Sequence, residues 1–384
     1  MSSHHTIFRA LLGVFSALIV LISLTGAAAN TFFHASIRTI DTGDALTAPT
    51  EPLRASQSPQ NTLPSPTPTA SEQAPTAPPA TPQGKPLNFL IIGSDTREDQ
   101  GKGFGSANQI TGQRSDTTML IHLNSTRSSA VVLSIPRDLW VTIPSCKTSA
   151  GTWTKPHEGR FNEAFSQGGA ECTIRTIKEV TGVPVNHVII VDFIGFQKMV
   201  DSAGGLTICT TKGIRDDKSG LVLTVGTHTL NGKEALALAR TRYSMGDGSD
   251  ISRIGRQQHI IKLFLTQLKQ SGALTNPTTV YPLAQDALSS LTMDPELADM
   301  ETFASLMTTA AQMNPDSVQY LTWPWVGRAD GATVETNTVP AKAIADALLT
   351  DSLPLPASIM GTPTPEPSST GKKNKKKLCA DPIN

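Results

Sequence analysis

The sequence predicts an α/β fold in which one central sheet is covered by helices on both faces. Leu87 to Gly93 is a short, largely apolar run that ends in glycine, as expected for a buried central strand. Further strand-like runs alternate with segments of helical spacing along the chain. Strands that alternate with helices in this way favour a layered α/β sandwich.

Six more strands are expected after Leu87 to Gly93, from runs of apolar and β-branched residues. They are predicted at Thr117 to Leu123, Ala130 to Ile135, His187 to Val191, Leu206 to Thr210, Leu221 to Val225 and Tyr320 to Trp323. The first two are separated only by a short link around Asn124-Ser125, so they are predicted to form a hairpin.

Helices are expected between and after these strands. Their predicted positions are Asn162 to Thr181, Phe193 to Ala203, Pro277 to Leu291, Pro295 to Met313 and Val339 to Leu349. Glycines are expected to interrupt or end the first two helices. Gly168-Gly169 breaks the first helix, Gly182 ends it, and Gly204-Gly205 ends the second. The spacing of Ile254, Ile261, Phe264 and Leu268 predicts one more amphipathic helix.

The two ends of the 384-residue chain do not have a globular composition. Residues 1–30 are expected to form a membrane anchor or a secretory signal, because Ala10 to Ala29 is uncharged over about the length that a helix needs to cross a bilayer. In both cases the body of the protein is exported. Residues 31–86 are expected to be a linker rich in proline, serine and threonine, 87–350 one folded domain, and 351–384 a disordered basic tail.

Charge and cysteine content limit the class of protein. The formal net charge is zero and 17% of residues are charged, so a nucleic-acid partner is not indicated. The four cysteines fit an exported protein, where disulfides persist. Cys146 and Cys172 flank one loop-rich insertion and are the expected bridge, which leaves Cys209 and Cys379 to staple the tail, although the sequence alone allows three pairings.

The segment from Leu238 to Gln258 contains four arginines. Arg253, Arg256 and Gln257 share one helical face through their i, i+3 and i+4 spacing, while Arg240 and Arg242 end the preceding run. A planar guanidinium group matches phosphate oxygens in a bidentate way, so this cluster suggests a phosphorylated ligand. Solvated surface arginines are the alternative from this stretch alone.

Three further short charged segments lie next to the expected strands. Asp95 comes just after the first strand, Asp116 opens the second, and Arg137 and Asp138 close the third. Ligands of open α/β sheets gather beyond strand ends, although turn or helix capping is an equal alternative for any one aspartate. Carboxylates among arginines suggest a bridging cation, and Mg²⁺ commonly takes one or two carboxylates plus phosphate oxygens. Asp95 and Asp116 are therefore candidate Mg²⁺ ligands for displacement at a phosphoryl or pyrophosphoryl group.

Several other classes of site lack their sequence signatures. The glycines from Gly101 to Gly105 are not part of a GxxxxGK[ST] phosphate loop, and no GxSxG nucleophile motif occurs. Outside the leader, no histidines have a paired ligand spacing, so a zinc site is not expected.

These charged segments belong to seven motifs, which follow one another along the chain in this order: NFLIIGSDTR, RSDTTMLIHL, SIPRDLWVTIP, RFNEAF, DFIGFQKMVDSAGGL, LNGKEALALARTR and DISRIGRQQ. Over roughly Asn88 to Gln270 the chain resembles the LytR-CpsA-Psr family. The resemblance implies a three-layer α/β/α sandwich with a central mixed sheet, held outside the cell membrane by a single-pass anchor. It makes 87–350 an extracytoplasmic catalytic domain with its core at 88–270.

The resemblance also implies roles for individual residues. Asp95 and Asp116 match the aspartates on the Mg²⁺ side. The pyrophosphate-binding residues are matched by Arg114, Arg137, Arg240, Arg242, Arg253 and Gln257, and more loosely by Arg160, whose motif reads Arg-Phe-Asn in place of the more usual Lys-Ile-Asn. The candidate catalytic residues are Asp95, Asp116, Arg137, Arg240 and Arg242. Asp138 and Arg256 are family-like positions without an assigned role, and no general base is assigned.

The implied activity is Mg²⁺-dependent phosphotransfer of a cell-wall glycopolymer from a polyprenyl-pyrophosphate carrier to peptidoglycan. The expected partners are the lipid-linked glycopolymer, peptidoglycan and the cytoplasmic membrane. The polyprenyl tail would lie in an apolar tunnel, for which ordinary core packing is the alternative at each candidate: Phe193, Phe196, Met199 and Val200. The alternative functions are a pyrophosphatase that hydrolyses the same donor and a non-catalytic lipid or glycopolymer-binding protein of wall assembly.

Overall fold

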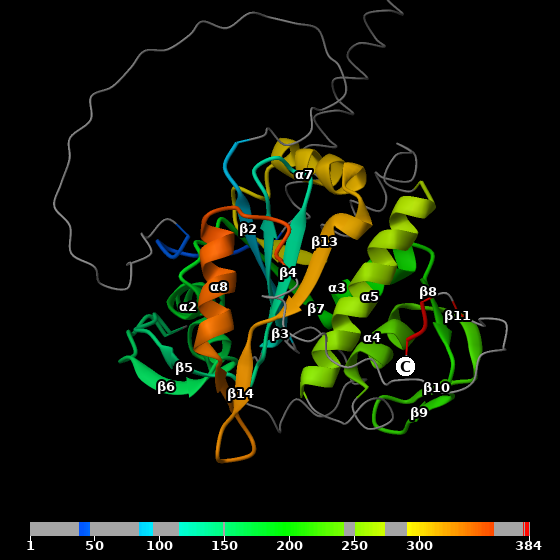
Figure 1. Cartoon of the computed structure of the whole chain (residues 1–384), viewed down its shortest axis with the longest axis horizontal. Helices are drawn as coiled ribbons and strands as arrows, with labels where there is room; N and C mark the ends of the chain where they lie inside the picture. The colour runs from blue at the N-terminus through cyan, green and yellow to red at the C-terminus, as the bar shows by residue number, and fades with distance from the viewer. Residues whose placement is uncertain are drawn as a thin grey trace, which may run out of the picture.

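The computed structural model describes residues 38–46, 84–94, 115–148, 150–241, 250–272, 290–356, 379 and 381–383. A seven-stranded sheet in the order β1-β12-β7-β2-β3-β4-β13 lies at its centre (Figure 1). The strands are β1 (Arg38–Thr39), β2 (Leu87–Ser94), β3 (Ser115–Leu123), β4 (Ala130–Ile135), β7 (His187–Asp192), β12 (Leu291–Met293) and β13 (Val318–Thr322). β2 pairs in parallel with β7 and antiparallel with β3, and β4 pairs antiparallel with β3 and in parallel with β13. The sheet is therefore mixed, as expected.

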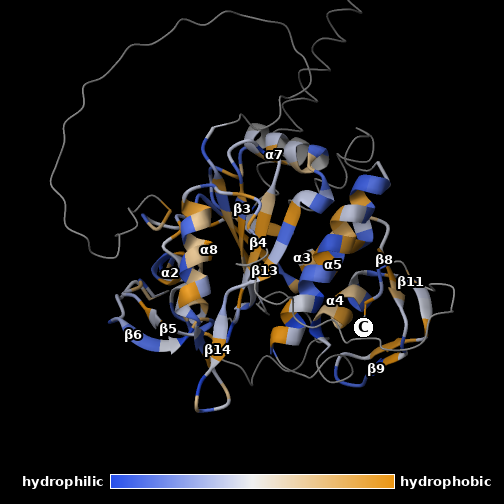
Figure 2. Cartoon of the chain, viewed as in Figure 1, coloured by the Kyte–Doolittle hydropathy of each residue, from blue (hydrophilic) through white to orange (hydrophobic). Residues whose placement is uncertain are grey.

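Helices cover both faces of this sheet, because successive side chains of a strand point to opposite sides. Leu90 and Ile92 of β2 lie in one buried cluster with side chains of α2 and α8, whereas Phe89 and Ile91 lie in another with side chains of α3 and α7. The central strands β3 and β4 are largely hydrophobic (Figure 2). The helices are α2 (Glu163–Thr181), α3 (Phe193–Ser202), α4 (Gly232–Arg240), α5 (Asp250–Gln270), α7 (Met300–Gln312) and α8 (Thr338–Leu349), with a 3₁₀ turn at Pro315–Ser317. The predicted three-layer sandwich is confirmed.

A smaller apolar cluster forms among α4, α5 and two short ribbons. β8 (Leu206–Thr210) pairs with β11 (Gly226–Leu230), and β9 (Ile214–Asp216) pairs with β10 (Leu221–Leu223). The core of this part includes Val200, Leu230 and Ile260. The sequence predicts β8 and β10 but not β11, in which only Leu230 is buried and no apolar pattern is visible.

Two more antiparallel ribbons lie at one end of the molecule (Figure 1). One consists of β5 (Trp140–Ile143) and β6 (His157–Arg160), and the other of β14 (Trp325–Gly327) and β15 (Val334–Thr336). A β-bridge between Leu139 and Val334 joins the two ribbons.

Part of the expected linker at residues 31–86 belongs to the fold. β1 pairs with β12, Ala45 is fully buried, and Lys178 of α2 donates a hydrogen bond to the Ala45 carbonyl. The linker prediction is therefore wrong over residues 38–46. A two-residue strand has no alternation to detect, and α2 supplies the contacts that hold this segment.

The prediction of a disordered tail at residues 351–384 is also wrong in part. Leu355 is buried in the main core, and Ile383 is buried against the ribbons beside α5. The Ile383 N–H donates to the carbonyl of Cys209, so the last described residues lie along β8. The buried side chains of Leu355 and Ile383 and the disulfide Cys209–Cys379 therefore anchor parts of a tail whose sequence is mostly polar.

Two expected helix positions also change. Leu291, the expected end of a helix from Pro277, begins strand β12, and residues 273–289 lie outside the described residues. The helix expected from Pro295 begins at Met300, where Asp299 caps the first turn by accepting the Thr302 N–H. Among the described helices, none is both long and apolar enough to cross a membrane. The expected anchor at residues 1–30 lies outside the described residues.

Two disulfides cross-link the described chain, Cys146–Cys172 and Cys209–Cys379. The first is the expected bridge, and it ties the loop after β5 to α2. The break in α2 at Gly168-Gly169 adjoins this bridge. A Cβ atom on Gly168 would lie 2.7 Å from the Lys147 carbonyl oxygen and 2.9 Å from Cys172 Cβ, so only glycine fits beside the cross-link.

Replacing both Cys146 and Cys172 with serine is expected to lower the free energy of unfolding by about 3 kcal/mol. The bridge spans a sequence separation of 26 residues and restricts the unfolded chain over that length. Urea unfolding of the oxidised wild type and the double variant measures the difference, with Cys209–Cys379 intact in both. Equal free energies of unfolding would contradict this account of the bridge.

Candidate functional site

Arg137 is the centre of a charged site at the end of the sheet where β4 stops and α5 begins. Its Nη1 atom donates to Asp116 Oδ1 of β3 at 3.0 Å. Its Nε atom lies 3.2 Å from Asp250 Oδ1 at the start of α5 and 3.4 Å from Asp138 Oδ2 in the same turn. Carboxylates from three parts of the chain therefore orient one guanidinium group.

Arg253 attaches α5 to the same point. Its side chain is buried, and its Nη2 atom donates to the main-chain carbonyl of Asp116 at 2.9 Å and to Asp250 Oδ1. One carboxylate oxygen of Asp250 thus bridges Arg137 and Arg253. The i, i+3 spacing within the first helical turn explains the contact between Asp250 and Arg253.

Arg160 extends the site along the β5–β6 ribbon. It ends β6, its Nη1 atom lies 3.6 Å from Asp138 Oδ1, and its side chain is 43% exposed. We call six residues the charged cluster: Asp116, Arg137, Asp138, Arg160, Asp250 and Arg253. Three formal positive charges and three negative charges balance within it. Its arginines are therefore held in place before any anionic ligand binds.

Burial and ion pairing act against each other in the charged cluster. Burial acts to lower the pKa of Arg137, but the carboxylates of Asp250, Asp138 and Asp116 raise it above its ordinary value. Burial raises the pKa of Asp250, although Arg253 and Arg137 act in the opposite direction. The Asp250 Oδ2 atom is buried and has no hydrogen-bond partner within the part of the chain that is described. The ion pairs of Asp250 thus offset a desolvation cost.

Asp250 is a site residue that the sequence analysis did not single out. A usable signal is present, because an acidic residue stands three positions before Arg253 in the first turn of an expected helix. Its contact with Arg137, from a distant part of the chain, cannot be deduced from that spacing.

Arg240 lies at the end of α4, a helix that begins with a capping box formed by Asn231 and Glu234. Its guanidinium carbon lies 4.6 Å from the centroid of the Phe193 ring, a cation–π contact that orients the side chain. Arg256 is buried and donates to the carbonyl of Thr241, which connects the end of α4 to the helix that carries Arg253. Arg256 therefore has a structural contact in the described fold.

The four candidates for a lipid tunnel do not share one cluster. Phe193 contacts Arg240, Phe196 and Val200 pack beside α4 and α5, and Met199 packs in the cluster on the α7 side of the sheet. Ordinary core packing, the alternative for each of them, accounts for the buried Val200.

Three of the predicted site residues, Asp95, Arg114 and Arg242, lie outside the described residues. Asp95 follows Ser94 and Arg114 precedes Ser115 in the sequence, and these two serines are paired between β2 and β3. Gln257 is half-buried on α5. The structure thus brings together Asp116, Arg137, Arg160 and Arg253, and the binding roles of all the predicted site residues stay predictions.

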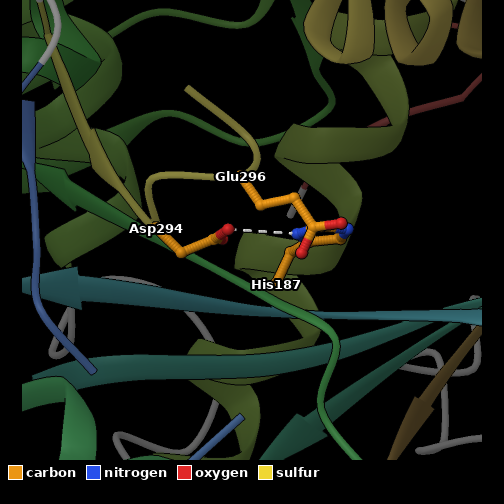
Figure 3. Close-up of side chains that lie close together, drawn as sticks. All are labelled: His187, Asp294 and Glu296. Atoms are coloured by element: carbon orange, nitrogen blue, oxygen red, sulfur yellow. Dashed lines mark hydrogen bonds and ion pairs between the residues drawn. The ribbon is translucent and has the colours of Figure 1, made fainter. Parts of the chain in front are cut away.

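A second group of side chains has the chemistry of metal ligands. The ligand atoms of His187, Asp294 and Glu296 all lie within 4.8 Å of one another, close enough to hold an ion (Figure 3). Both oxygens of Asp294 are already engaged, because Oδ2 accepts from the Val188 N–H at 2.9 Å and Oδ1 accepts from the Leu297 N–H at 3.0 Å. Oδ1 also lies 3.2 Å from His187 Nδ1. Burial acts to raise the pKa of Asp294, but these hydrogen bonds lower it below its ordinary value.

Replacing Asp294 with asparagine is expected to lower the free energy of unfolding by about 1–3 kcal/mol, because an amide cannot accept both buried N–H groups in place of the carboxylate. The loss is expected to be the same with and without EDTA, as measured by urea unfolding. A wild type that EDTA destabilises by this amount, beside a variant that EDTA leaves unchanged, would instead indicate a bound metal ion.

Comparison with known proteins agrees with the motifs and the fold. The sequence pattern of the LytR_cpsA_psr family matches residues 55–348. Over 211 residues the chain is 30% identical to the probable cell wall biosynthesis protein LcpB of Corynebacterium glutamicum. This alignment covers 54% of this chain and 48% of LcpB. Over 247 residues it is 29% identical to the polyisoprenyl-teichoic acid–peptidoglycan teichoic acid transferase TagT of Bacillus subtilis. This alignment covers 61% of this chain and 71% of TagT.

The solved structure of TagT bound to LI-WTA has the same fold. Its TM-score against this chain is 0.51 at 23% sequence identity, over 71% of this chain and 92% of that one. The chain spans about half the length of some relatives, 48% of LcpB and 54% of LcpA from Corynebacterium glutamicum. The family match nevertheless extends over most of the sequence and includes the whole charged cluster. The chain therefore belongs to the LytR_cpsA_psr family.

Proposed function

We propose that this protein is a phosphotransferase that moves a cell-wall glycopolymer from a polyprenyl-pyrophosphate carrier to peptidoglycan. The observation that supports this most is Arg137, a guanidinium group fixed by three carboxylates beside Arg253 and Arg160. A relative in the same family is named for the transfer of teichoic acid to peptidoglycan. A structure of TagT contains a ligand abbreviated LI-WTA, which supports a lipid-linked polymer as the donor class.

The proposed reaction is a displacement at the phosphorus atom that carries the polymer. An acceptor hydroxyl oxygen forms a bond to this phosphorus, and the bond from phosphorus to the bridging pyrophosphate oxygen breaks. Polyprenyl phosphate leaves with that oxygen, the hydroxyl proton passes to a base, and the polymer is joined through a phosphodiester. Arg137 and Arg253 would donate to the non-bridging oxygens and stabilise the charge that develops on the leaving phosphate.

We further propose that Asp116, together with Asp95, binds Mg²⁺ at the pyrophosphate. Carboxylate oxygens are the ligands that this hard cation prefers. The Asp116 side chain is 34% exposed, so an ion can reach it, while Arg137 holds its Oδ1 atom. A bound Mg²⁺ would neutralise part of the pyrophosphate charge. Arg137 would then also orient Asp116 as a metal ligand.

The proposed location is the outer face of the cytoplasmic membrane, with the folded part attached through the apolar run Ala10 to Ala29. Two disulfides support an exported compartment, because such bonds persist where thiols are not kept reduced.

The test follows both products of the reaction. The full chain in detergent micelles is incubated with a polyprenyl-pyrophosphate-linked glycopolymer, Mg²⁺ and peptidoglycan fragments. The expected result is polymer covalently attached to the fragments and a rate that EDTA removes. Release of phosphate without attached polymer would indicate a pyrophosphatase, and binding of the lipid without turnover would indicate a non-catalytic binding protein.

Replacing Asp116 with asparagine is expected to raise the Mg²⁺ concentration needed for half-maximal transfer by at least about tenfold, because the amide removes the anionic ligand. The rate is measured across a Mg²⁺ titration beside the wild type. An unchanged Mg²⁺ requirement in a folded variant would remove Asp116 from the proposed metal site.

A further inference from the structure

The β5–β6 ribbon presents an outward face directly beside the charged cluster. Val141 and Ile143 of β5 point into the main core, so Trp140 and Thr142 lie on the opposite side of the ribbon. The antiparallel register places Arg160 opposite Trp140 and Glu158 opposite Thr142. We call these four residues, together with Arg328 of the neighbouring ribbon, the Trp140 face: Trp140, Thr142, Glu158, Arg160 and Arg328.

Arg328 orients the tryptophan of this face. Its guanidinium carbon lies 4.5 Å from the centroid of the Trp140 ring. Arg328 follows β14 in a turn where its N–H donates to the carbonyl of Thr333. The β14–β15 ribbon is in turn attached to the charged cluster, because the Val334 N–H donates to the Asp138 carbonyl at 3.2 Å. Trp140 is therefore held at a defined place relative to Asp138.

The Trp140 face is continuous with the proposed reaction centre. Arg160 belongs to both, since it contacts Asp138 from the cluster and stands opposite Trp140 in the ribbon. Thr142 donates to the carboxylate of Glu158 on the same face. The adjoining β14 exposes Trp325, which is 38% accessible. The ribbons β5, β6 and β14 lie together at one end of the molecule (Figure 1).

The chemistry of this face suits a chain of sugars. Indole rings pack against the flat C–H faces of pyranose rings, and aromatic side chains with nearby polar groups are frequent in recognition surfaces. Glu158 can accept from sugar hydroxyls, while Arg160 and Arg328 can donate to hydroxyl and carboxylate oxygens. The face thus offers an aromatic ring beside both hydrogen-bond donors and an acceptor, a mixture that suits the many hydroxyl groups of a glycan. We therefore match this face to the acceptor and the charged cluster to the pyrophosphate of the donor.

The in-line geometry of the proposed displacement also supports the Trp140 face as the acceptor site. In a displacement at phosphorus, the attacking and leaving oxygens lie roughly in line on opposite sides of the reacting atom. An acceptor polymer must then rest on a surface that borders the charged cluster. We propose that the Trp140 face binds the glycan strand of peptidoglycan, an inference that rests on the transferase function proposed above.

The binding experiment uses a peptidoglycan tetrasaccharide without peptide stems as its probe. The tetrasaccharide is titrated into the full chain in micelles, with no donor present, and its affinity is measured by calorimetry. Replacing Trp140 with leucine is expected to weaken binding about tenfold, as for an aromatic residue at the centre of an interface. Glu158→Gln, a change at an exposed position of the same face, is expected to weaken it about threefold through loss of charge-assisted hydrogen bonds.

Trp153 provides a matched control. It is 57% exposed, and Arg175 lies over its ring at 5.5 Å, but it belongs to the loop after β5 and not to the Trp140 face. Trp153→Leu is expected to bind the tetrasaccharide within about twofold of the wild type, as is usual for a surface residue outside an interface. In the transfer assay, Trp140→Leu is expected to raise the KM for the acceptor far more than it lowers kcat.

Two results would overturn the proposal: no binding of the tetrasaccharide by the wild type, or equal binding by wild type, Trp140→Leu and Glu158→Gln. The outcome is separate from that of the proposed function, because the titration contains no donor. Tetrasaccharide binding that depends on Trp140, in a protein that transfers no polymer, would support the face and count against the transferase.

Discussion

Replacing Arg137 with alanine is expected to lower kcat/KM for polymer transfer by about 10²- to 10³-fold. The substitution removes a donor to the developing phosphate charge and leaves the carboxylates of Asp116, Asp138 and Asp250 without their shared cation. Arg137→Lys is expected to recover only a small part of the rate. A single ammonium group cannot reproduce the planar fork that contacts these carboxylates from separate nitrogen atoms.

Transfer rates of wild type, Arg137→Ala and Arg137→Lys are compared with those of Arg215→Ala. Arg215 is an exposed arginine that pairs only with the exposed Asp217 among the contacts in the described chain. Its replacement is expected to change the rate by less than about twofold, in line with the small contribution of surface ion pairs. A folded Arg137→Ala that retains the rate of Arg215→Ala would contradict the assignment of Arg137 to the reaction centre.

Replacing Asp250 with asparagine is expected to lower the free energy of unfolding by about 3 kcal/mol. The change neutralises the one oxygen that accepts from both Arg137 and Arg253, and the buried Arg253 loses its anionic partner. The same loss of orientation is expected to lower kcat for transfer, because both arginines are proposed to donate to the pyrophosphate. Urea unfolding and the transfer assay measure the two effects.

Asp217→Asn is the matched control for Asp250→Asn. Asp217 is an exposed carboxylate paired with Arg215, so its neutralisation is expected to change the free energy of unfolding by less than about 0.5 kcal/mol. Equal stability of Asp250→Asn and Asp217→Asn would show that the bridge between Arg137 and Arg253 does not hold the charged cluster together.

The centre of the fold could be predicted because its strands carry their own signal. β2 and β4 are apolar almost throughout, and the Gly168-Gly169 break in α2 is visible as a glycine pair. β1 could not be predicted, because two polar residues become a strand only through pairing with β12. β12 is three residues long, and its apolar ends fit a helix as well as a strand. Short edge strands depend on tertiary contacts that local patterns do not contain.

The candidate site was predictable as a set of positions but not as a set of contacts. The motifs and strand ends single out Asp116, Arg137 and Arg253, which the fold brings together. The sequence did not predict that Arg137 is shared by three carboxylates, because those contacts join β3, the turn after β4 and α5. The partners of a buried charge are set by how the elements pack, so they appear only in the folded arrangement.

Transfer of a labelled glycopolymer is the most direct measurement of the central claim that this arginine site acts on a polyprenyl pyrophosphate. The full chain and its Arg137→Ala variant are each incubated with the labelled lipid-linked polymer, Mg²⁺ and peptidoglycan fragments. The proposed function predicts label covalently attached to the fragments by the wild type and little or none by Arg137→Ala. Label attached equally by both proteins, or released only as free polymer by the wild type, would contradict it.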